Sequence, residues 1–420
     1  MKRLARQDRS AGRHPSRVPH RSVSWIGSVS CFDRRLHYES VWVLFAVNGK
    51  SLVANLEGLS IAVDARIVKR PGIGFYTYLQ GAMQCLLDMG ARVSLLTNFP
   101  PENYESLFPT AEWLEFGSHR NLIWDQYDLP KFLRRKAFDL YWAPCNNGIP
   151  FLPAGRTAKV STTHDMVPIR LPRLYLVRRP LFALPYLVWT SAVMLRSDTI
   201  LTVSRSSARD IRHFSGRRAI VIPPVFYPLA TQGDPALVPP GLLHRNYIVY
   251  NGGLDPRKNV LNLLKGFAMV GREWPDLLLV MMGRGYSSLD SPIAELGISK
   301  SIVRTGYVDE NTRSAIISLA AAMAYPSLYE GFGLPLLEAF ATGTPVLTAA
   351  NSSLAEVAGD AAVYVDPRDP SSIAEGIMRM RDPHLAADLR LKGLERLSHF
   401  DPMVSRERLV IELATAARGR

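Results

Sequence analysis

Short apolar runs that end in glycine turns and lead into helical stretches recur along the chain, and this alternation constrains the fold most. The run LSIAVDA at 59–65 is followed by RPGIG and by the amphipathic stretch Phe75–Leu87. Similar runs at 91–98, 139–143, 159–163 and 199–204 are separated by helical segments. A repeated strand–turn–helix order predicts a parallel sheet with helices on both faces. The first half of the chain is therefore expected to form a doubly wound α/β domain.

A second series of the same kind follows a segment that is rich in proline and glycine. The stretch PPVFYPLATQGDPALVPPGLL at 223–243 interrupts any regular element and predicts a linker. After it, the runs YIVYNGG, DLLLVMMGRG, IVRTGYV, AAMAYPS, PVLTA and AAVYVD each predict a strand. A length of 420 residues also favours more than one domain. We expect Rossmann-like domains at 59–225 and 244–400, a linker at 226–243, and a terminal helix at 401–420 that packs back on the first domain.

The basic charge of the chain is concentrated at its start. The formal net charge is +13, and the first 35 residues hold nine arginines and lysines against two aspartates. This leader, 1–58, is predicted to be disordered and dispensable. The rest of the chain carries only about half of the excess positive charge, which argues against nucleic acid as a partner of its body. The three cysteines, Cys31, Cys85 and Cys145, form no C-x-x-C pair, which favours a reducing compartment such as the cytoplasm.

One apolar stretch, Pro180–Leu195, bears on membrane contact. It is interrupted by Pro185 and is shorter than the roughly 18–20 residues of a membrane span. A buried or interfacial helix is therefore expected. Four arginines precede it, and they make a peripheral contact with the cytoplasmic face of an inner membrane an alternative: Arg170, Arg173, Arg178 and Arg179.

The segment YEGFGLPLLEAFATGTPV at 329–346 predicts a phosphate-binding turn. It follows a predicted strand, and Pro335 is well placed as the first residue of a helix that Gly343 ends. The backbone N–H groups of Gly333 and Leu334 would then point away from the helix without partners. Such N–H groups at a helix start bind phosphate.

Two glutamates flank that turn. Glu330 lies on the loop, and Glu338 is expected within the first turn of the helix. A carboxylate in this position can accept hydrogen bonds from a pair of sugar hydroxyls, as the acidic residue of dinucleotide folds does for ribose. The alternative for Glu338 is a favourable charge at a helix start.

Cations and a histidine follow other predicted strands. Arg257 and Lys258, in NGGLDPRKN, come after a strand and a glycine turn and could neutralise a diphosphate. His164 and Asp165, in THDMVP, stand at a strand end, where a side chain would project into a cleft.

The glycine turn RPGIGFY contains Gly72 and Gly74 between a strand and a helix. It is only a partial dinucleotide fingerprint, because Thr77 stands where a third glycine is required. We interpret it as a loop whose backbone can approach a phosphate.

In combination, these segments resemble the retaining glycosyltransferases of family 4, which have the GT-B fold of two Rossmann-like domains facing a central cleft. The resemblance covers 59 to the C-terminus. Its residues are V-D-A-R at 63–66, P-G-I-G-x-Y at 71–76, H-D at 164–165, T-V-S at 202–204, P-R-K-N at 256–259 and E-G-F-G-L-P-L-L-E at 330–338. Many relatives carry an extra basic residue where this chain has Gly252 and Gly253.

The resemblance implies a role for each site residue toward a nucleotide sugar. Glu338 is expected to bind the ribose, and Arg257 and Lys258 the departing diphosphate. Glu330 would bind hydroxyls of the donor sugar, and His164 would contact the transferred sugar. Asp165 is expected to hold its loop. The remaining donor-binding residues would be Gly72, Gly74, Gly331, Phe332, Gly333 and Leu334.

The resemblance also implies the reaction. A hexose would pass from a nucleoside-diphosphate sugar to a saccharide or polyprenyl-linked acceptor with retention of configuration, in cell-surface polysaccharide or lipopolysaccharide synthesis. The motif set is most similar to mannosyltransferases, which points to GDP-mannose. No D-x-D run for a divalent metal occurs in either half, so we expect transfer without a metal or other cofactor.

Three alternatives remain open from the sequence. A nucleotide-sugar epimerase can share the same architecture. An NAD-dependent oxidoreductase is disfavoured, because neither half has a complete G-x-G-x-x-G. A non-enzymatic protein that binds through its basic arm would lose function when 1–50 are deleted.

Overall fold

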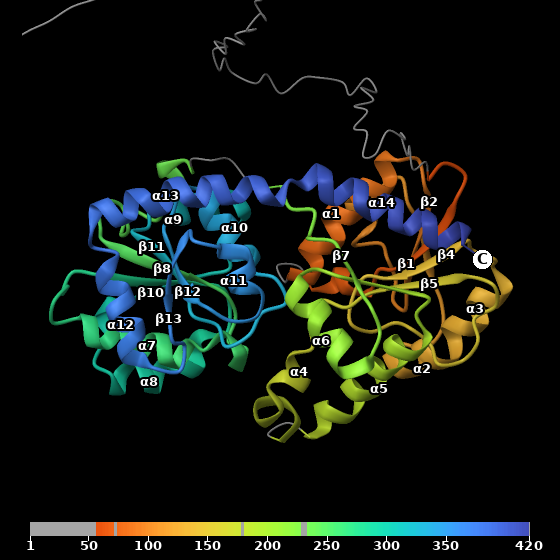
Figure 1. Cartoon of the computed structure of the whole chain (residues 1–420), viewed down its shortest axis with the longest axis horizontal. Coiled ribbons are helices and arrows are strands. Elements are labelled where there is room, and N and C mark those ends of the chain that lie inside the picture. Colours follow the sequence, from red (N-terminus) through yellow and green to blue (C-terminus); the bar gives the residue numbers. More distant parts are fainter. Residues whose placement is uncertain (1–55, 71–73, 178–179, 228–232, 420) are drawn as a thin grey trace, which may run out of the picture. The chain divides into compact units, whose positions relative to one another are not determined.

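The computed structural model describes residues 56–70, 74–177, 180–227 and 233–419. The predicted leader, 1–58, lies outside these residues except for its last three. Leu56 is fully buried in the core, so the ordered chain extends further back than the predicted start at Leu59. The described residues contain two parallel sheets, and helices cover both faces of each (Figure 1). The predicted architecture, two Rossmann-like halves, is confirmed.

The N-terminal half is built on a seven-stranded sheet with the order β3-β2-β1-β4-β5-β6-β7. Its strands are β1 (Ser60–Asp64), β2 (Arg92–Thr97), β3 (Glu112–Glu115), β4 (Leu140–Ala143), β5 (Ala158–Thr162), β6 (Thr199–Thr202) and β7 (Ile220–Val221). Its helices are α1 (Gly74–Asp88), α2 (Asn121–Ile123), α3 (Leu129–Arg135), α4 (Val167–Arg170), α5 (Pro180–Arg196) and α6 (Arg205–Ser215).

Strand β1 shows why this sheet is covered on both faces. Successive side chains of a strand point to opposite faces. Ile61 and Val63 accordingly join one hydrophobic cluster, and Ala62 between them joins another. All three are fully buried. A strand buried on both faces reads as a continuous apolar run, which is the pattern that predicted it.

The C-terminal half is built on a six-stranded sheet with the order β10-β9-β8-β11-β12-β13. Its strands are β8 (Tyr247–Asn251), β9 (Leu278–Met282), β10 (Ile302–Gly306), β11 (Ala322–Tyr325), β12 (Val346–Ala349) and β13 (Ala362–Val365). Its helices are α7 (Val260–Val270), α8 (Asp290–Glu295), α9 (Glu310–Ser318), α10 (Leu334–Ala341), α11 (Ser352–Ala358), α12 (Pro370–Arg379) and α13 (Pro383–Leu397).

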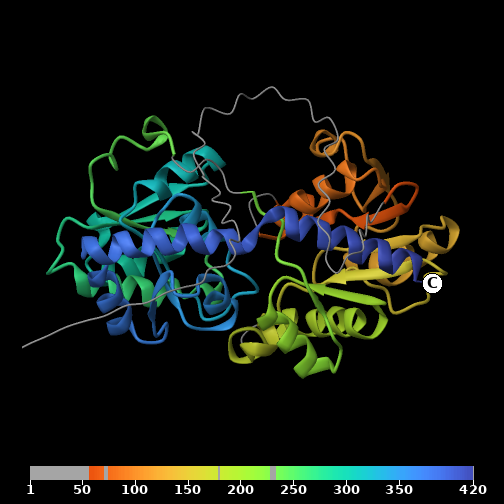
Figure 2. The same ribbon diagram turned by 45° about the horizontal axis from the view of Figure 1, so that its top comes forward.

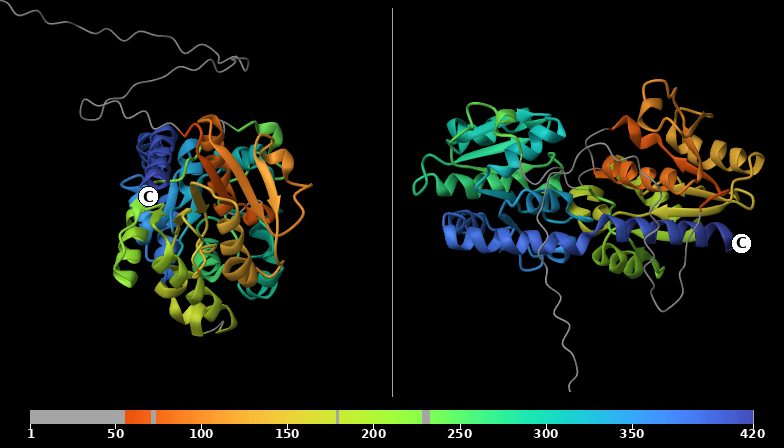
Figure 3. Two further views of the ribbon diagram at one scale, coloured as in Figure 1. Left: turned by 90° about the vertical axis from the view of Figure 1, so that its right-hand side faces the viewer. Right: turned by 90° about the horizontal axis from the view of Figure 1, so that it is seen from above.

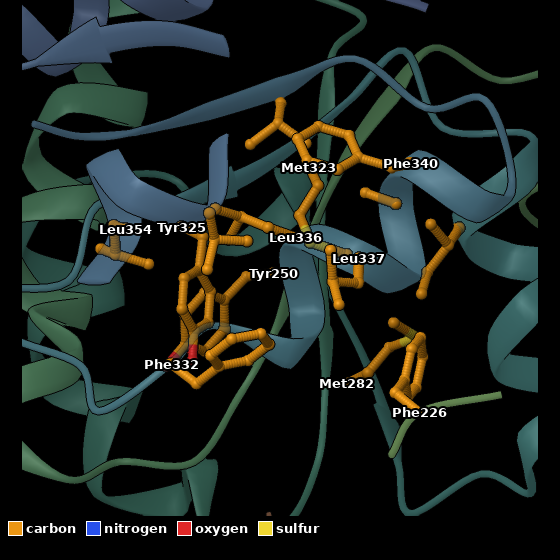
Figure 4. Close-up of a cluster of buried hydrophobic side chains, with 14 of the residues drawn as sticks. Phe226, Tyr250, Met282, Met323, Tyr325, Phe332, Leu336, Leu337, Phe340 and Leu354 are labelled. Atoms are coloured by element: carbon orange, nitrogen blue, oxygen red, sulfur yellow. The ribbon is translucent and has the colours of Figure 1, made fainter. Parts of the chain in front are cut away.

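Helix α10 is anchored by apolar side chains, and this anchoring sets the position of its N-terminus. Leu336, Leu337 and Phe340 are each at most 1% exposed and pack in the core of the C-terminal half (Figure 4). The same view shows Tyr250 and Tyr325 from adjacent strands, whose rings stack with their centroids 6.2 Å apart. Because the helix is fixed along its length, its first backbone N–H groups are held at the carboxyl edge of the sheet.

The final helix, α14 (Pro402–Arg418), contacts the N-terminal half. It packs on α1, and Figures 2 and 3 show it in blue beside that helix. Arg406 forms an ion pair of 3.0 Å with Asp88 at the end of α1. Such a helix was expected at 401–420. Among the described residues, no helix combines the length and the apolar character that crossing a membrane requires.

In both sheets the strand order reverses in the middle. The position of this reversal indicates where a ligand can lie. In the N-terminal half the reversal falls between β1 and β4, and in the C-terminal half between β8 and β11. Ligands of open α/β sheets bind beyond the carboxyl ends of the strands at such a reversal. The loops after β8 and β11 carry Arg257, Lys258 and Glu330, so the sequence motifs lie at the expected place.

Candidate functional site

A cavity of about 740 Å³ lies at the carboxyl ends of the strands and is lined by residues of both halves. Its size is typical of a pocket for a small-molecule ligand. The predicted site residues that line it are Gly74, His164, Asp165, Arg257, Lys258, Glu330, Gly331, Phe332, Gly333, Leu334 and Glu338. Gly72 was also predicted to bind the donor, but it lies outside the described residues.

Glu330 forms the centre of a buried charge cluster in this cavity. Its side chain is 7% exposed and pairs with Arg257 through Oε2 and with Lys258 through Oε1, the latter at 2.7 Å. Burial alone would raise the pKa of Glu330, but the two cations outweigh burial and lower it to about 2. Glu330 is therefore an anion at neutral pH, and the three side chains together carry one net positive charge when both cations are protonated.

Lys258 has a second partner, which the sequence did not indicate. Its ammonium group contacts the hydroxyl of Tyr325 at the end of β11 and lies 4.6 Å from the centre of that ring. Burial lowers the pKa of Lys258, whereas Glu330 raises it. Arg257 also donates to the carbonyl oxygen of Tyr329 at 3.2 Å. Both cations are thus held by the loop that carries Glu330.

The glycines of the Glu330 loop are required by close packing and by backbone conformation. A Cβ on Gly331 would lie 2.5 Å from the carbonyl oxygen of His164, which is closer than van der Waals contact allows. Gly333 has φ +127°, which favours glycine, and it immediately precedes α10. The side chain of Phe332 is buried in the hydrophobic core and is 7% exposed (Figure 4).

Glu338 lies further along α10 than predicted. The helix begins at Leu334, so Pro335 is its second residue and Glu338 its fifth, outside the first turn. The expectation of a charge in the first turn was therefore wrong, because Gly333 already occupies the cap position. Glu338 accepts a hydrogen bond of 2.6 Å from the amide of Asn251 and pairs with Arg313 at 3.4 Å. Burial raises the pKa of Glu338 and Arg313 opposes that rise.

His164 is held as a neutral ring. Its Nε2 lies 2.7 Å from the carbonyl oxygen of Pro144, so Nε2 carries the proton and Nδ1 is the acceptor. The rings of Phe75 and Tyr78 each meet it edge to face with centroids 4.6 Å away. Burial among these groups lowers the pKa of His164 to about 4. The ring can therefore hydrogen-bond a ligand hydroxyl near neutral pH but cannot serve there as an acid.

Asp165 contacts its own loop and the loop that follows β4. Its Oδ1 accepts from the backbone N–H of Val167 at 3.4 Å and from the side chain of Asn146 at 3.3 Å. Burial raises its pKa, and Arg257 across the cavity opposes that rise. These contacts tie the loop that follows β5 to the loop that follows β4.

The V-D-A-R motif forms an ion network that the sequence did not predict. Arg66 pairs with Asp64 at 2.6 Å and with Asp125 at 2.6 Å. Its guanidinium group also lies 4.0 Å from the ring centre of Trp124. Burial raises the pKa of Asp125 to about 6, and Arg66 limits the rise. Asp125 comes from a different element, 59 residues away, so no local pattern in the sequence could connect the two.

Two family models together match most of the chain. Residues 74–226 match the model described as "Glycosyltransferase Family 4", and residues 241–393 match "Glycosyl transferases group 1". The two matched segments coincide with the two halves of the structure. They favour transfer over the epimerase, oxidoreductase and non-enzymatic alternatives.

Curated relatives resemble only part of the chain. The O-antigen chain mannosyltransferase B of Escherichia coli is 32% identical over 165 residues, which are 38% of this chain and 43% of that protein. The MMP alpha-(1->4)-mannosyltransferase of Mycolicibacterium hassiacum is 32% identical over 190 residues, 44% of this chain and 45% of that protein. The matches thus span less than half the length of these relatives.

Solved structures resemble nearly the whole described chain. WaaG, a glycosyltransferase involved in lipopolysaccharide biosynthesis, superposes with a TM-score of 0.66 at 16% identity, over 84% of this chain and 99% of that one. Anabaena Alr3699/HepE in complex with UDP and glucose superposes with a TM-score of 0.64 at 16% identity, over 85% of this chain and 100% of that one. At such low identity these matches establish the fold alone.

Proposed function

The chain belongs to family 4 of the glycosyltransferases, the retaining hexosyltransferases of GT-B fold, and on that premise we propose that it transfers mannose from GDP-mannose to a saccharide or polyprenyl-linked acceptor. The class of donor, a nucleotide sugar, follows from the family. The identity of the donor and of the acceptor, and a place in polysaccharide or lipopolysaccharide synthesis, belong to the proposal. They are supported by the likeness to an O-antigen chain mannosyltransferase.

The observation that carries the proposal is the buried pairing of Glu330 with both Arg257 and Lys258 inside the cavity. Two cations held by a carboxylate are already ordered and desolvated before any ligand arrives. Electrostatic groups arranged in this way stabilise charge that develops during a reaction. A departing nucleoside diphosphate is the charge that this family's reaction produces.

Each residue has a part in the proposed reaction. Arg257, Lys258 and the N–H groups of Gly333 and Leu334 face the diphosphate. Glu330 accepts hydrogen bonds from hydroxyls of the sugar, and so does the free Nδ1 of His164. Glu338, already oriented by Asn251 and Arg313, takes the ribose hydroxyls.

The bonds change on one face of the sugar. The bond between the anomeric carbon and the diphosphate oxygen breaks, and the bond to the acceptor oxygen forms with retained configuration. The proton of the acceptor hydroxyl passes to the leaving phosphate oxygen. No described group needs to supply a proton, which agrees with the neutral state of His164.

Membrane contact is part of the proposal through helix α5. Leu187, Ser191 and Leu195 follow one another at intervals of four residues on one face of that helix, and all three are exposed. Leu181, near the start of the helix, is 93% exposed. Arginines at both ends of this region, including Arg173 and Arg196, complement an anionic lipid surface. These features support peripheral contact with the inner membrane, and a cytoplasmic location is part of the same proposal.

The test is a screen of nucleotide sugars by thermal shift and by release of nucleoside diphosphate in the presence of acceptor. GDP-mannose is expected to raise the melting temperature and to release GDP. Release from UDP-sugars alone would overturn the choice of donor, and no release from any nucleotide sugar would overturn the proposal itself.

The metal requirement is tested in the same assay. We expect EDTA to leave the initial rate unchanged, because Arg257 and Lys258 supply the positive charge. Loss of activity in EDTA that Mg²⁺ or Mn²⁺ restores would contradict transfer without a metal.

A further inference from the structure

The first turn of helix α6 in the N-terminal half is bound by a carboxylate of the C-terminal half. Glu356, on α11, accepts from the backbone N–H of Arg205 at 3.0 Å through Oε1 and from that of Ser206 at 3.1 Å through Oε2. The first N–H groups of a helix have no partner inside it, and they form the positive end of its dipole. A carboxylate is therefore the side chain that this position binds best.

Both oxygens of Glu356 are occupied by these amides. Among the described residues Glu356 has no ion pair with an arginine or lysine. Its side chain is half-buried. The contact is thus a directed pairing of one carboxylate with one helix start, rather than one member of a network of surface charges.

The same helix α11 holds the backbone of the Glu330 loop. The backbone N–H of Glu330 donates to the hydroxyl of Ser352 at 3.0 Å. The hydroxyl of Ser353 lies 2.8 Å from the carbonyl oxygen of Glu330 and 2.6 Å from that of Phe332. Glu356 lies one helical turn beyond these serines on the same helix. The contact of Glu356 with α6 therefore also fixes the position of the two serines that hold the backbone of Glu330.

Helix α6 meets the Glu330 loop from the other side. The hydroxyl of Ser207, in the first turn of α6, lies 2.7 Å from the carbonyl oxygen of His164 and 3.3 Å from that of Gly331. One turn later, Asp210 accepts from the hydroxyl of Tyr329 at 2.5 Å. The first turn of α6 therefore contacts the loops that carry His164 and Glu330, which come from different halves of the chain.

We propose that Glu356 is a positioning residue for glycosyl transfer: by binding the start of α6 it sets the loop of Glu330 against the loop of His164. Glu356 is not among the residues that line the cavity. It acts through Ser352 and Ser353 on one side and through α6 on the other. The inference rests on the proposed transferase function, and it assigns a role to a residue that no motif of the sequence marked.

The first experiment measures the contact itself. Amide hydrogen exchange of the peptide that contains Arg205 and Ser206 is compared between the wild-type chain and Glu356→Gln, with GDP or UDP as the added nucleotide. Glu375→Gln is the matched control, because Glu375 is an exposed glutamate on α12. We expect exchange about tenfold faster in Glu356→Gln, since the charge at a partly buried helix start is lost, and unchanged exchange in the control. Equal exchange in all three proteins would overturn the proposal.

The second experiment separates positioning from simple stabilisation. In Glu356→Gln we expect kcat with GDP-mannose to fall about tenfold, the factor that corresponds to loss of such a charge. The Kd for GDP should stay within about twofold, because the proposed nucleotide contacts lie in the C-terminal half. Tyr329→Phe removes only the hydroxyl that binds Asp210. In this variant kcat should also fall, by a smaller factor, and the Kd for GDP should again stay nearly unchanged.

The outcomes are distinguishable from failure of the proposed function. An unchanged kcat in Glu356→Gln, or a loss of kcat that is matched by loss of GDP affinity and of melting temperature, would overturn the positioning role. A wild-type chain that transfers from no nucleotide sugar would instead overturn the proposed function. Hydrogen exchange would then still decide whether Glu356 binds α6.

Discussion

The C-terminal half brings its charges into the cavity, whereas the N-terminal half keeps its main ion network away from it. Arg257, Lys258 and Glu330 all line the cavity. Arg66 and its partners Asp64 and Asp125 do not, although they are equally well paired. What the N-terminal half presents to the cavity instead includes the neutral ring of His164 and the loop that carries Asp165.

This difference separates two uses of buried charge. A buried ion pair stabilises a fold only when its geometry is good, because burial of the charges is costly. In the N-terminal half the network joins β1 to a distant helix and has a structural effect. In the C-terminal half the cluster carries net positive charge in a cavity, which is suited to an anionic ligand. Substitutions in each of the two clusters separate these two uses.

The largest effect is expected from Arg66→Ala, which leaves two buried carboxylates without their cation. Loss of one partner of a buried pair costs about 3–5 kcal/mol of unfolding free energy. Urea denaturation should show this loss, and Arg66→Lys should recover part of it. The Kd for GDP, measured on the folded fraction, should be unchanged. A large change in that Kd would show that the N-terminal network serves the ligand.

The next effect is expected from Lys258→Ala. Removal of a group that stabilises developing charge typically costs about 10²-fold in kcat. Lys265→Ala is the control, because Lys265 is an exposed lysine on the neighbouring helix α7. Steady-state kinetics should show the loss of kcat in Lys258→Ala and not in Lys265→Ala. A normal kcat in Lys258→Ala would contradict a role of the charge cluster in the reaction.

A smaller effect, mainly on affinity, is expected from Glu338→Ala. Hydrogen bonds to a charged group are worth about 1.5–3 kcal/mol, or roughly tenfold to a hundredfold in affinity. Isothermal titration with GDP should show this weakening, with a lesser change in kcat. Unaltered GDP binding would contradict the assignment of Glu338 to the ribose.

The smallest effect concerns pH and His164. Its pKa is about 4 in the folded chain and about 6.5 in the unfolded one, so the unfolded state binds more protons between those values. The wild-type chain should therefore lose stability as the pH falls from 6.5 to 4. His164→Gln cannot titrate, and its unfolding free energy should change less over that window. Equal slopes of the two curves would contradict the buried neutral state.

The fold could be predicted from the sequence because buried parallel strands form continuous apolar runs. Strands β3 and β7 were not predicted. The first is EWLE, with a charged residue at each end, and the second has two residues. In both, the run is too short or too polar to signal a strand, and pairing with the neighbouring strand decides its conformation.

The candidate site could be predicted where its residues are contiguous. Glu330 and Lys258 stand in motifs of a few residues, and both line the cavity. Asn251 and Glu356 escaped prediction, because their partners are 87 and about 150 residues away. Such pairs are brought together by the order of the strands and by the meeting of the two halves, which no local spacing encodes.

The most direct test of the central claim, that Glu330 and its two cations form the donor site, is the rate of nucleoside-diphosphate release by Glu330→Gln. Glu375→Gln serves as the matched control. The account predicts a loss of about 10²-fold or more in Glu330→Gln with a folded chain and a normal rate in the control. A near-normal rate in Glu330→Gln would contradict it.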